Sequence, residues 1–486
     1  MKKRLLIGLF AFLVLGSLPY LSGLIVEYQL NNFIGNLALP EGVSVKVDGY
    51  HVRYARSWAQ IEITATKPAY PDMPFASFFK YTGDTHVSYI RLKIFHGPIF
   101  PKENDRLTMG LGRIAFYAKA NDLAPANAIL QDSLENFFEK NEIIAGNATL
   151  TLLGNLDIDF ATAPAYYKSD EGSLSFEGVT GKASVSTDLN RIKLDLHVSP
   201  LLLQGKHDSM IDMAAMTLAS EGERSKNSPW VGKQTMSLPS FYLRDEAGNT
   251  IRFNQFTLDT ASHVKSGLAN ITLNAAANDV EFFNEKFINT TFKLIMDKLD
   301  AKGLADFSRI SHHQDELSEG DWQVARRNAL IDMFKKGAEL SLIYTLTVEQ
   351  GKVLAEAQVQ FPDLHKEEGT PEHFAQQMIL KMKASLSLHA PLMWMEDTLY
   401  RMALPHIPAD APPVTDPHTK QTIPAREALR MEISDQFNAL NEAQVLITDQ
   451  GNSAFNLRYE GGKILLNGKS LTPEDLVKLM SILDPQ

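Results

Sequence analysis

The sequence contains no cysteine. This absence excludes a disulfide framework, an iron–sulfur cluster, a thiolate nucleophile and a zinc site with cysteine ligands. Positive charge is also in short supply, because 47 Lys and Arg residues face 58 Asp and Glu residues, for a net charge of −11. Such a balance disfavours binding to DNA or RNA, and no basic stretch with interleaved aromatic residues offsets it. We therefore predict no nucleic-acid partner.

Motifs of well-known enzymes are absent as well. The sequence has no G-x-S-x-G elbow of a serine hydrolase and no H-E-x-x-H pair of a zinc protease. The histidine-rich stretch SHHQDE, residues 311–316, is interpreted as a solvated loop, because adjacent histidines do not share a helix face. Carboxylates are spread evenly, so no pair stands out as a general acid and base. We assign no catalytic residue, no metal ligand, no cofactor-binding residue and no cofactor.

Residues 461–470 read GGKILLNGKS and resemble a phosphate-binding loop at first sight. Such a loop needs four residues between its first glycine and the Gly-Lys pair, whereas five separate Gly462 from Gly468. The intervening residues alternate as in a strand. Asn467 and Gly468 form a dipeptide that is favoured in tight turns with positive φ. We therefore predict a strand followed by a structural turn.

The chain does have a long apolar segment near its start. After the cations Lys2, Lys3 and Arg4, residues 5–26 carry no charge. About 20 apolar residues suffice to cross a bilayer as a helix, and the leading cations favour a cytoplasmic N-terminus. We predict a transmembrane anchor, with everything from Glu27 onward exported. A cleaved secretory signal is the competing interpretation, and it also exports the body of the chain.

Beyond this segment, apolar and polar residues alternate with a period of two over long stretches. Such strands have one buried and one solvated face, which is typical of antiparallel sheets. We predict an α+β, β-rich fold with large, mostly antiparallel curved sheets and amphipathic helices, preceded by the N-terminal transmembrane helix. The predicted helices cover residues 125–141, 281–310, 321–340, 370–383, 392–403 and 424–443.

Proline marks the strongest break in composition. The segment 405–424 carries Pro405, Pro408, Pro412, Pro413, Pro417 and Pro424, which favour an exposed connector over regular structure. A softer boundary lies near residues 221–230. The predicted parts are an N-terminal membrane anchor or uncleaved signal at 1–27, a first β-rich region at 28–220, a second α+β region at 221–404, the Pro-rich connector at 405–424, and a C-terminal module of a helix plus a β-hairpin at 425–486.

The stretch KIFHGPIF, residues 93–100, ends a predicted strand with His96, Gly97 and Pro98. Glycine relaxes φ and proline ends a hydrogen-bonded ladder, so we interpret these residues as a structural strand stop in which the imidazole bonds nearby backbone. A ligand role for His96 is the alternative. The same stretch, followed by LSFEGVTGKASVS at 174–186, LIMDKLDAKGLADFSRI at 294–310 and GGKILLNGKSL at 461–471, resembles the YdgA-like family of bacterial envelope proteins of unknown function.

The resemblance covers nearly the whole chain, including the charged start and the single membrane segment. It implies a single-pass protein of the bacterial inner membrane, with a cytoplasmic N-terminus and a periplasmic body. The family has no catalytic residues to carry over, and the Pro-rich segment 405–424 has no match in its pattern.

Three functions stay open on the sequence. The first is a non-enzymatic envelope scaffold or lipid-handling protein built on amphipathic β-sheets, with the inner membrane as its partner through residues 5–26. The alternative is an exported cell-wall or polysaccharide hydrolase that uses paired carboxylates. The third is an assembly subunit that binds other envelope proteins through a sheet edge or the Pro-rich connector. Because long sheets leave edges, a homo-oligomer stays open too.

Overall fold

The chain forms two compact units. Unit 1 comprises Met1–Lys226 and Gly232–Thr250, and unit 2 comprises Asn227–Val231 and Ile251–Gln486. Among the described residues, 24 strands join antiparallel ladders and four more form two separate hairpins, which confirms the predicted β-rich α+β class. The computed structural model describes residues 2–35, 42–51, 53, 56–66, 84–97, 99–101, 107–138, 142–186, 188–224, 229–282, 285–312, 318–365, 369–404, 407–408, 410–415, 421–472 and 475.

Unit 1 is built on two antiparallel ladders. The longer ladder has the order β1–β2–β3–β6–β7–β8–β11–β12–β15. Alternating side chains give it one apolar face and one more polar face. Its strands are β1 (Val43–His51), β2 (Arg56–Thr66), β3 (Thr85–His96), β6 (Gly112–Ala118), β7 (Ile144–Leu150), β8 (Asn155–Thr162), β11 (Val179–Ser186), β12 (Arg191–Val198) and β15 (Met216–Glu223).

The shorter ladder of unit 1 has the order β9–β10–β13–β14–β16. Its strands are β9 (Ala165–Ser169), β10 (Gly172–Phe176), β13 (Leu201–Gln204), β14 (Met210–Met213) and β16 (Val231–Arg244). The small hairpin of β4 (Ile99–Pro101) with β5 (Leu107–Met109), and the short helices α3 (Ala120–Leu123) and α4 (Ala128–Phe137), also belong to this unit.

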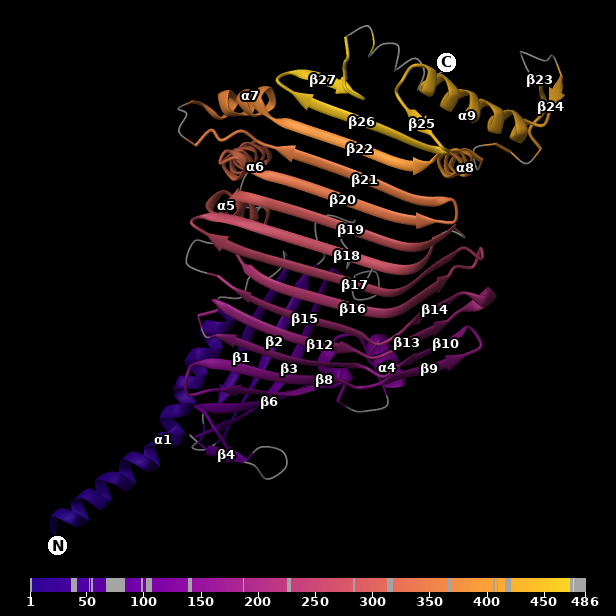
Figure 1. Cartoon of the computed structure of the whole chain (residues 1–486). Coiled ribbons are helices and arrows are strands. Elements are labelled where there is room, and N and C mark those ends of the chain that lie inside the picture. The colour runs from indigo at the N-terminus through magenta and orange to yellow at the C-terminus, as the bar shows by residue number, and fades with distance from the viewer. Residues whose placement is uncertain are drawn as a thin grey trace. The chain divides into compact units, whose positions relative to one another are not determined.

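Helix α1 (Lys2–Gly35) packs on the apolar face of the longer ladder with its C-terminal turns (Figure 1). Val26 is buried in one cluster with Ile94 and Ile114, and Leu30 packs at the margin of that cluster. The main core of unit 1 is therefore closed in part by a helix that continues from the chain start.

No helix in the described part of the chain has both the length and the hydropathy that crossing a membrane requires. The side chains of residues 2–18 lie outside the described part. Most side chains of the transmembrane span predicted at residues 5–26 are therefore not described, and the span stays a prediction.

Unit 2 is built on an antiparallel ladder with the order β17–β18–β19–β20–β21–β22–β26–β27–β28. A short strand, β25, also pairs with β26. The strands are β17 (Thr250–Lys265), β18 (Leu268–Phe282), β19 (Glu285–Asp300), β20 (Glu339–Val348), β21 (Gly351–Gln360), β22 (Lys383–Pro391), β25 (Ile447–Asp449), β26 (Asn452–Glu460), β27 (Lys463–Leu466) and β28 (Lys469–Ser470).

Helices lie at both ends of the strands of unit 2, as Figure 1 shows. Ser318 caps one of them and Thr370 another, because each side chain accepts a hydrogen bond from a backbone N–H in the first turn. At one end lie α5 (Ala301–His312), α6 (Glu319–Phe334) and α7 (Pro371–Lys381), and at the other end lie α8 (Leu392–Ala403) and α9 (Ala425–Glu442).

The helix predicted at residues 281–310 is wrong over its first part. Glu285–Asp300 forms strand β19, and the helix begins only at Ala301. The strand pairs with β18 on one side and β20 on the other, so both edges of its backbone find hydrogen-bond partners. Pairing on both edges outweighs the helix-like spacing of its apolar residues.

The C-terminal part of the chain is continuous with the sheet of unit 2. Strand β26 pairs with β22 along its whole length, although the Pro-rich segment 405–424 separates them in sequence. Within that segment, β23 (Val414–Thr415) pairs with β24 (Thr422–Ile423), while residues 405, 406, 409 and 416–420 lie outside the described part. The Pro-rich segment therefore contains a short β-hairpin despite its prolines.

Candidate functional site

An apolar row crosses the sheet of unit 2 from β18 to β27. Each residue of the row lies directly opposite the next one in antiparallel register, so their side chains share one face. We call this set the leucine row. It consists of Leu273, Leu294, Leu342, Ala357, Leu386, Leu457 and Leu466. At the usual strand spacing the row spans about 29 Å.

Two further rows flank the leucine row on the same face, and we call the three rows together the apolar face. Small side chains at Ala355 and Ala357 in β21 lie between larger ones in β20 and β22. The flanking rows are Ala275, Phe292, Tyr344, Ala355, Leu388 and Phe455 on one side, and Ile271, Met296, Leu340, Val359, Ala384, Tyr459 and Ile464 on the other.

Helices cover the two ends of the apolar face and leave its middle open. At one end, Met296 packs against the cluster formed with α5 and α6, and the Tyr459 hydroxyl donates a 2.8 Å hydrogen bond to the carbonyl of Ile379 in α7. At the other end, Leu388 packs in a cluster with α8. Between these ends, Leu386 is 40% exposed, and most other members of the leucine row are half-buried.

The opposite face of the same strands is more polar. On β22, Ser385 and Ser387 alternate with Leu386, and Ser387 lies opposite Glu356 and Asn456. Leu386 and Ser387 are therefore adjacent on one strand and lie on opposite faces of the sheet.

The apolar face carries almost no group that could exchange a proton. Among its residues, only Tyr344 and Tyr459 bear a polar side chain, and burial raises the pKa of Tyr344. Such a surface can take up hydrocarbon, whereas acid–base or nucleophilic chemistry would need ionisable groups that it lacks.

The structure places His96 at the last position of β3, in the core of unit 1. Its Nε2 lies 2.6 Å from the Oγ of Ser57, a fully buried residue of β2. The ring packs on Gly23 of α1, where an added Cβ would lie 3.2 Å from the imidazole. Burial lowers the pKa of His96, so the ring is neutral near pH 7. Its Nδ1 has no hydrogen-bond partner among the described residues.

A serine and a histidine at this distance could suggest a nucleophile and its base. Ser57 is closed off from any substrate, however, and no described carboxylate orients the Nδ1 of His96. Tyr50 supports a structural interpretation, because its hydroxyl donates a 3.2 Å hydrogen bond to the carbonyl of Gly23, and burial raises its pKa to about 12. The geometry thus serves the docking of α1 on the sheet.

The strand stop around His96 differs in one detail from the sequence prediction. The imidazole bonds the side chain of Ser57 and not the backbone. Gly97 has a φ of 125°, a value that favours glycine, while Pro98 lies outside the described residues. Nothing in the local sequence pointed to Ser57, which is 39 residues away from its partner.

Asn467 and Gly468 form the two-residue connection between β27 and β28, with φ values of 49° and 85°. The Asn467 side chain accepts a 2.8 Å hydrogen bond from the backbone N–H of Asn456. It also donates to the carbonyls of Gln444 at 2.8 Å and Val445 at 3.0 Å. The turn is thereby tied to the segment that follows α9.

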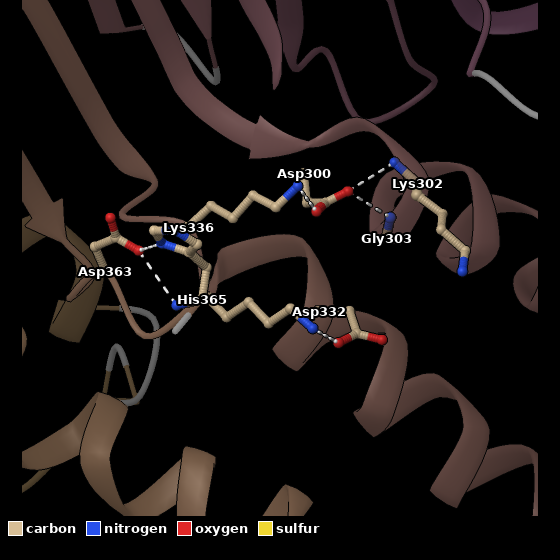
Figure 2. Close-up of polar contacts among 8 residues, drawn as sticks. Asp300, Lys302, Gly303, Asp332, Lys336, Asp363 and His365 are labelled. Carbon is tan, nitrogen blue, oxygen red and sulfur yellow. Dashed lines mark hydrogen bonds and ion pairs between the residues drawn. The ribbon is translucent and has the colours of Figure 1, made fainter. Parts of the chain in front are cut away.

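Figure 2 shows a charged cluster beside α5 and α6. The carboxylate of Asp300 accepts hydrogen bonds from the backbone N–H groups of Lys302 at 2.9 Å and Gly303 at 3.3 Å, and it forms a 2.5 Å ion pair with Lys336. Burial alone would raise the pKa of Asp300, but the ion pair and the backbone hydrogen bonds outweigh it and hold the pKa below its usual value. The carboxylate thus caps α5.

Asp363 and His365 lie in the same view and pair at 2.5 Å between Oδ1 and Nδ1. A metal site would need more ligands, and the described residues contain no group of three or more His, Asp or Glu side chains suited to one. Most of the histidine-rich stretch 311–316 lies outside the described residues.

The sequence model of one protein family, described as "Bacterial protein of unknown function (DUF945)", matches residues 1–474. No curated protein and no solved structure matches the chain.

Proposed function

The chain belongs to this bacterial family of unknown function, and from that premise we propose that it is a non-enzymatic envelope protein that holds lipid acyl chains on the apolar face of unit 2. In this proposal, residues 5–26 anchor the chain in the inner membrane. The N-terminus stays in the cytoplasm and the body lies in the periplasm. The resemblance to YdgA-like envelope proteins supports this location.

The observation that carries the proposal is the half-exposed leucine row. A continuous apolar surface left open to water is uncommon unless something binds there. Each methylene group that leaves water for such a surface contributes about 0.8 kcal/mol, so an acyl chain gains affinity along its length. A polysaccharide would instead require hydrogen-bonding groups, which the apolar face lacks.

The anchor supports lipid as the occupant. A span at residues 5–26 would hold the exported body beside a bilayer, where acyl chains are the most abundant apolar molecules. The helices at both ends of the apolar face limit the open strip to the direction of the leucine row, which suits an extended chain.

Co-purification tests the proposal. We would extract the full-length chain in mild detergent and quantify bound phospholipid by mass spectrometry. We expect phospholipid with the unaltered chain and a several-fold loss with Leu386→Gln, because the amide would face hydrocarbon without a partner. The matched variant Ser387→Gln, on the opposite face of the same strand, should retain lipid.

A folded, lipid-free chain would contradict the proposal and favour a plain scaffold. Equal lipid content in the two variants would show that the bound lipid belongs to the anchor and not to the apolar face.

A further inference from the structure

A cluster of cations and aromatic rings lies on the polar face of unit 1. Neighbouring strands bring it together, because Arg56 lies opposite Phe95, which in turn lies opposite Arg113. Trp58 lies opposite Lys93. We call this set the basic patch, and it consists of Arg53, Arg56, Trp58, Lys93, Phe95 and Arg113.

The cations stack on the rings. The guanidinium of Arg56 lies 5.5 Å from the ring centre of Phe95, and the Nζ of Lys93 lies 5.4 Å from the same ring. Arg53 lies 5.3 Å above the ring of Trp58, which is 42% exposed. Rings and cations therefore form one surface.

The charge of the basic patch opposes that of the whole chain, which is −11. Among the described residues, no carboxylate forms an ion pair with Arg56 or Lys93. Further along β3, by contrast, Arg91 pairs with the buried carboxylate of Asp122 at 2.6 Å. Positive charge is thus neutralised away from the end of β3 and concentrated at that end.

The basic patch lies at the end of the sheet from which α1 leaves. His96, next to Phe95, contacts Gly23 of α1, and Gly112, next to Arg113, contacts Val26. From there α1 extends away from the strands toward the N-terminus (Figure 1). Because Gly23 and Val26 pack on the sheet, a span formed by the preceding residues of α1 would place this end of β2, β3 and β6 at the level of the bilayer surface.

We propose that the basic patch binds the anionic phospholipid headgroups of the bilayer that holds α1. This inference rests on the proposed anchoring of residues 5–26. Arginine and lysine donate charge-assisted hydrogen bonds to phosphate, and tryptophan favours the membrane–water interface. A patch of this composition offsets the repulsion that the net negative chain meets at an anionic surface.

A single fluorescent label tests the contact, because the chain has no cysteine of its own. We would introduce Ala115→Cys, opposite Lys93 on β6, attach a polarity-sensitive dye, and reconstitute the full chain into vesicles. One set would contain phosphatidylcholine alone and the other added phosphatidylglycerol. We expect a blue shift only with phosphatidylglycerol, and none for a label at Thr217→Cys on β15.

Charge-matched variants would show which cations are needed for the blue shift. The pair Arg56→Gln and Lys93→Gln should abolish the blue shift. The pair Lys46→Gln and Lys182→Gln removes the same charge elsewhere in unit 1 and should preserve it. Loss of the shift in both pairs would overturn the proposal, because net charge alone would then explain the effect.

The failures are distinguishable. If the chain does not insert into either kind of vesicle, the anchor is wrong and the headgroup contact fails with it. If the chain inserts but the label at residue 115 reports water in both compositions, the headgroup contact is overturned while the anchor stands.

Discussion

The two units build the same kind of sheet and treat its apolar face differently. In unit 1, α1 packs on that face and seals Ile94 completely from solvent. In unit 2, the described helices pack near the ends of the strands, and Leu386 remains 40% exposed in the middle. One face is a closed core in the region that α1 covers, and the other is an open surface.

The difference follows from where each unit obtains its helices. Helix α1 enters unit 1 from the chain start and can lie over several strands. The helices of unit 2 arise in connections between successive strands, so they begin and end near strand termini. An amphipathic sheet therefore becomes a closed core or an open surface according to what the connections can cover.

The largest expected contrast is between Ile94→Ala in unit 1 and Leu386→Ala in unit 2. The first deletes a fully buried side chain and should cost about 2–5 kcal/mol of unfolding free energy. The second truncates a side chain that is already 40% exposed, and it should cost about 1 kcal/mol of unfolding free energy or less. Hydrogen exchange measured peptide by peptide in detergent would report the unfolding free energy of each unit separately. Equal costs would mean that the apolar face of unit 2 is covered in solution.

A second test concerns the helices that close one end of the apolar face. Gly303 of α5 packs so closely on α6 that an added Cβ would lie 2.5 Å from the backbone nitrogen of Met333. Gly303→Ala should therefore destabilise unit 2 by about 1–3 kcal/mol.

Gly320→Ala is the matched control for the helix packing, because no atom beyond its chain neighbours and the backbone of its own helix lies within 4 Å of its added Cβ. We expect Gly320→Ala to leave the midpoint of chemical denaturation unchanged or slightly raised. If Gly303→Ala behaved in the same way, α5 and α6 would have to pack less closely than the structure shows.

Mild acid should lower the stability of unit 1 and leave that of unit 2 unchanged. Because burial lowers the pKa of His96, the unfolded chain binds the proton more tightly, and unit 1 should lose stability as the pH falls below about 6.5. Asp300 in unit 2 also has a lowered pKa, and its contribution should be lost only as the pH falls below about 4. Hydrogen exchange at pH 7 and pH 5 would measure how the stability of each unit changes.

His96→Gln serves as the control for the acid effect, because glutamine is uncharged and can still reach Ser57. This variant should remove the pH dependence of unit 1 between pH 7 and pH 5. If His96→Gln keeps the pH dependence, another group in unit 1 must titrate between pH 7 and pH 5. The docking of α1 would then not depend on a neutral His96.

The smallest expected effects come from ion pairs. Lys336→Gln removes the partner of the mostly buried Asp300 and should cost about 1 kcal/mol. Lys206→Gln breaks an exposed pair with Glu171 and should cost less than about 0.5 kcal/mol. Thermal unfolding of the two variants would rank them. The reverse order would show that the charged cluster at α5 adds nothing to unit 2.

Local pattern in the sequence was enough to predict the sheets, because alternation of side chains is a property of each strand alone. It was not enough for residues 285–300, where LIMDKL fits helix spacing and only pairing on both edges decides for a strand. Asn467-Gly468 was recognisable as a turn from two residues, yet its hydrogen bonds to residues 444 and 445 depend on the fold.

The open surface itself could not be predicted in the same way. The leucine row needs β18 and β27 in one register, although almost two hundred residues separate them in sequence. A shift by one residue in any strand would break the row, and no local pattern fixes that register over such distances. Likewise, the contact of His96 with Ser57 exists only once β2 and β3 are paired.

Photo-crosslinking at adjacent positions of β22 tests most directly whether the apolar face of unit 2 holds acyl chains. The photoreactive residue benzoylphenylalanine would replace Leu386 in one chain and Ser387 in another, and membranes containing radiolabelled phospholipid would be irradiated. We predict that residue 386 captures phospholipid and residue 387 does not. Capture at both positions, or at neither, would contradict the account.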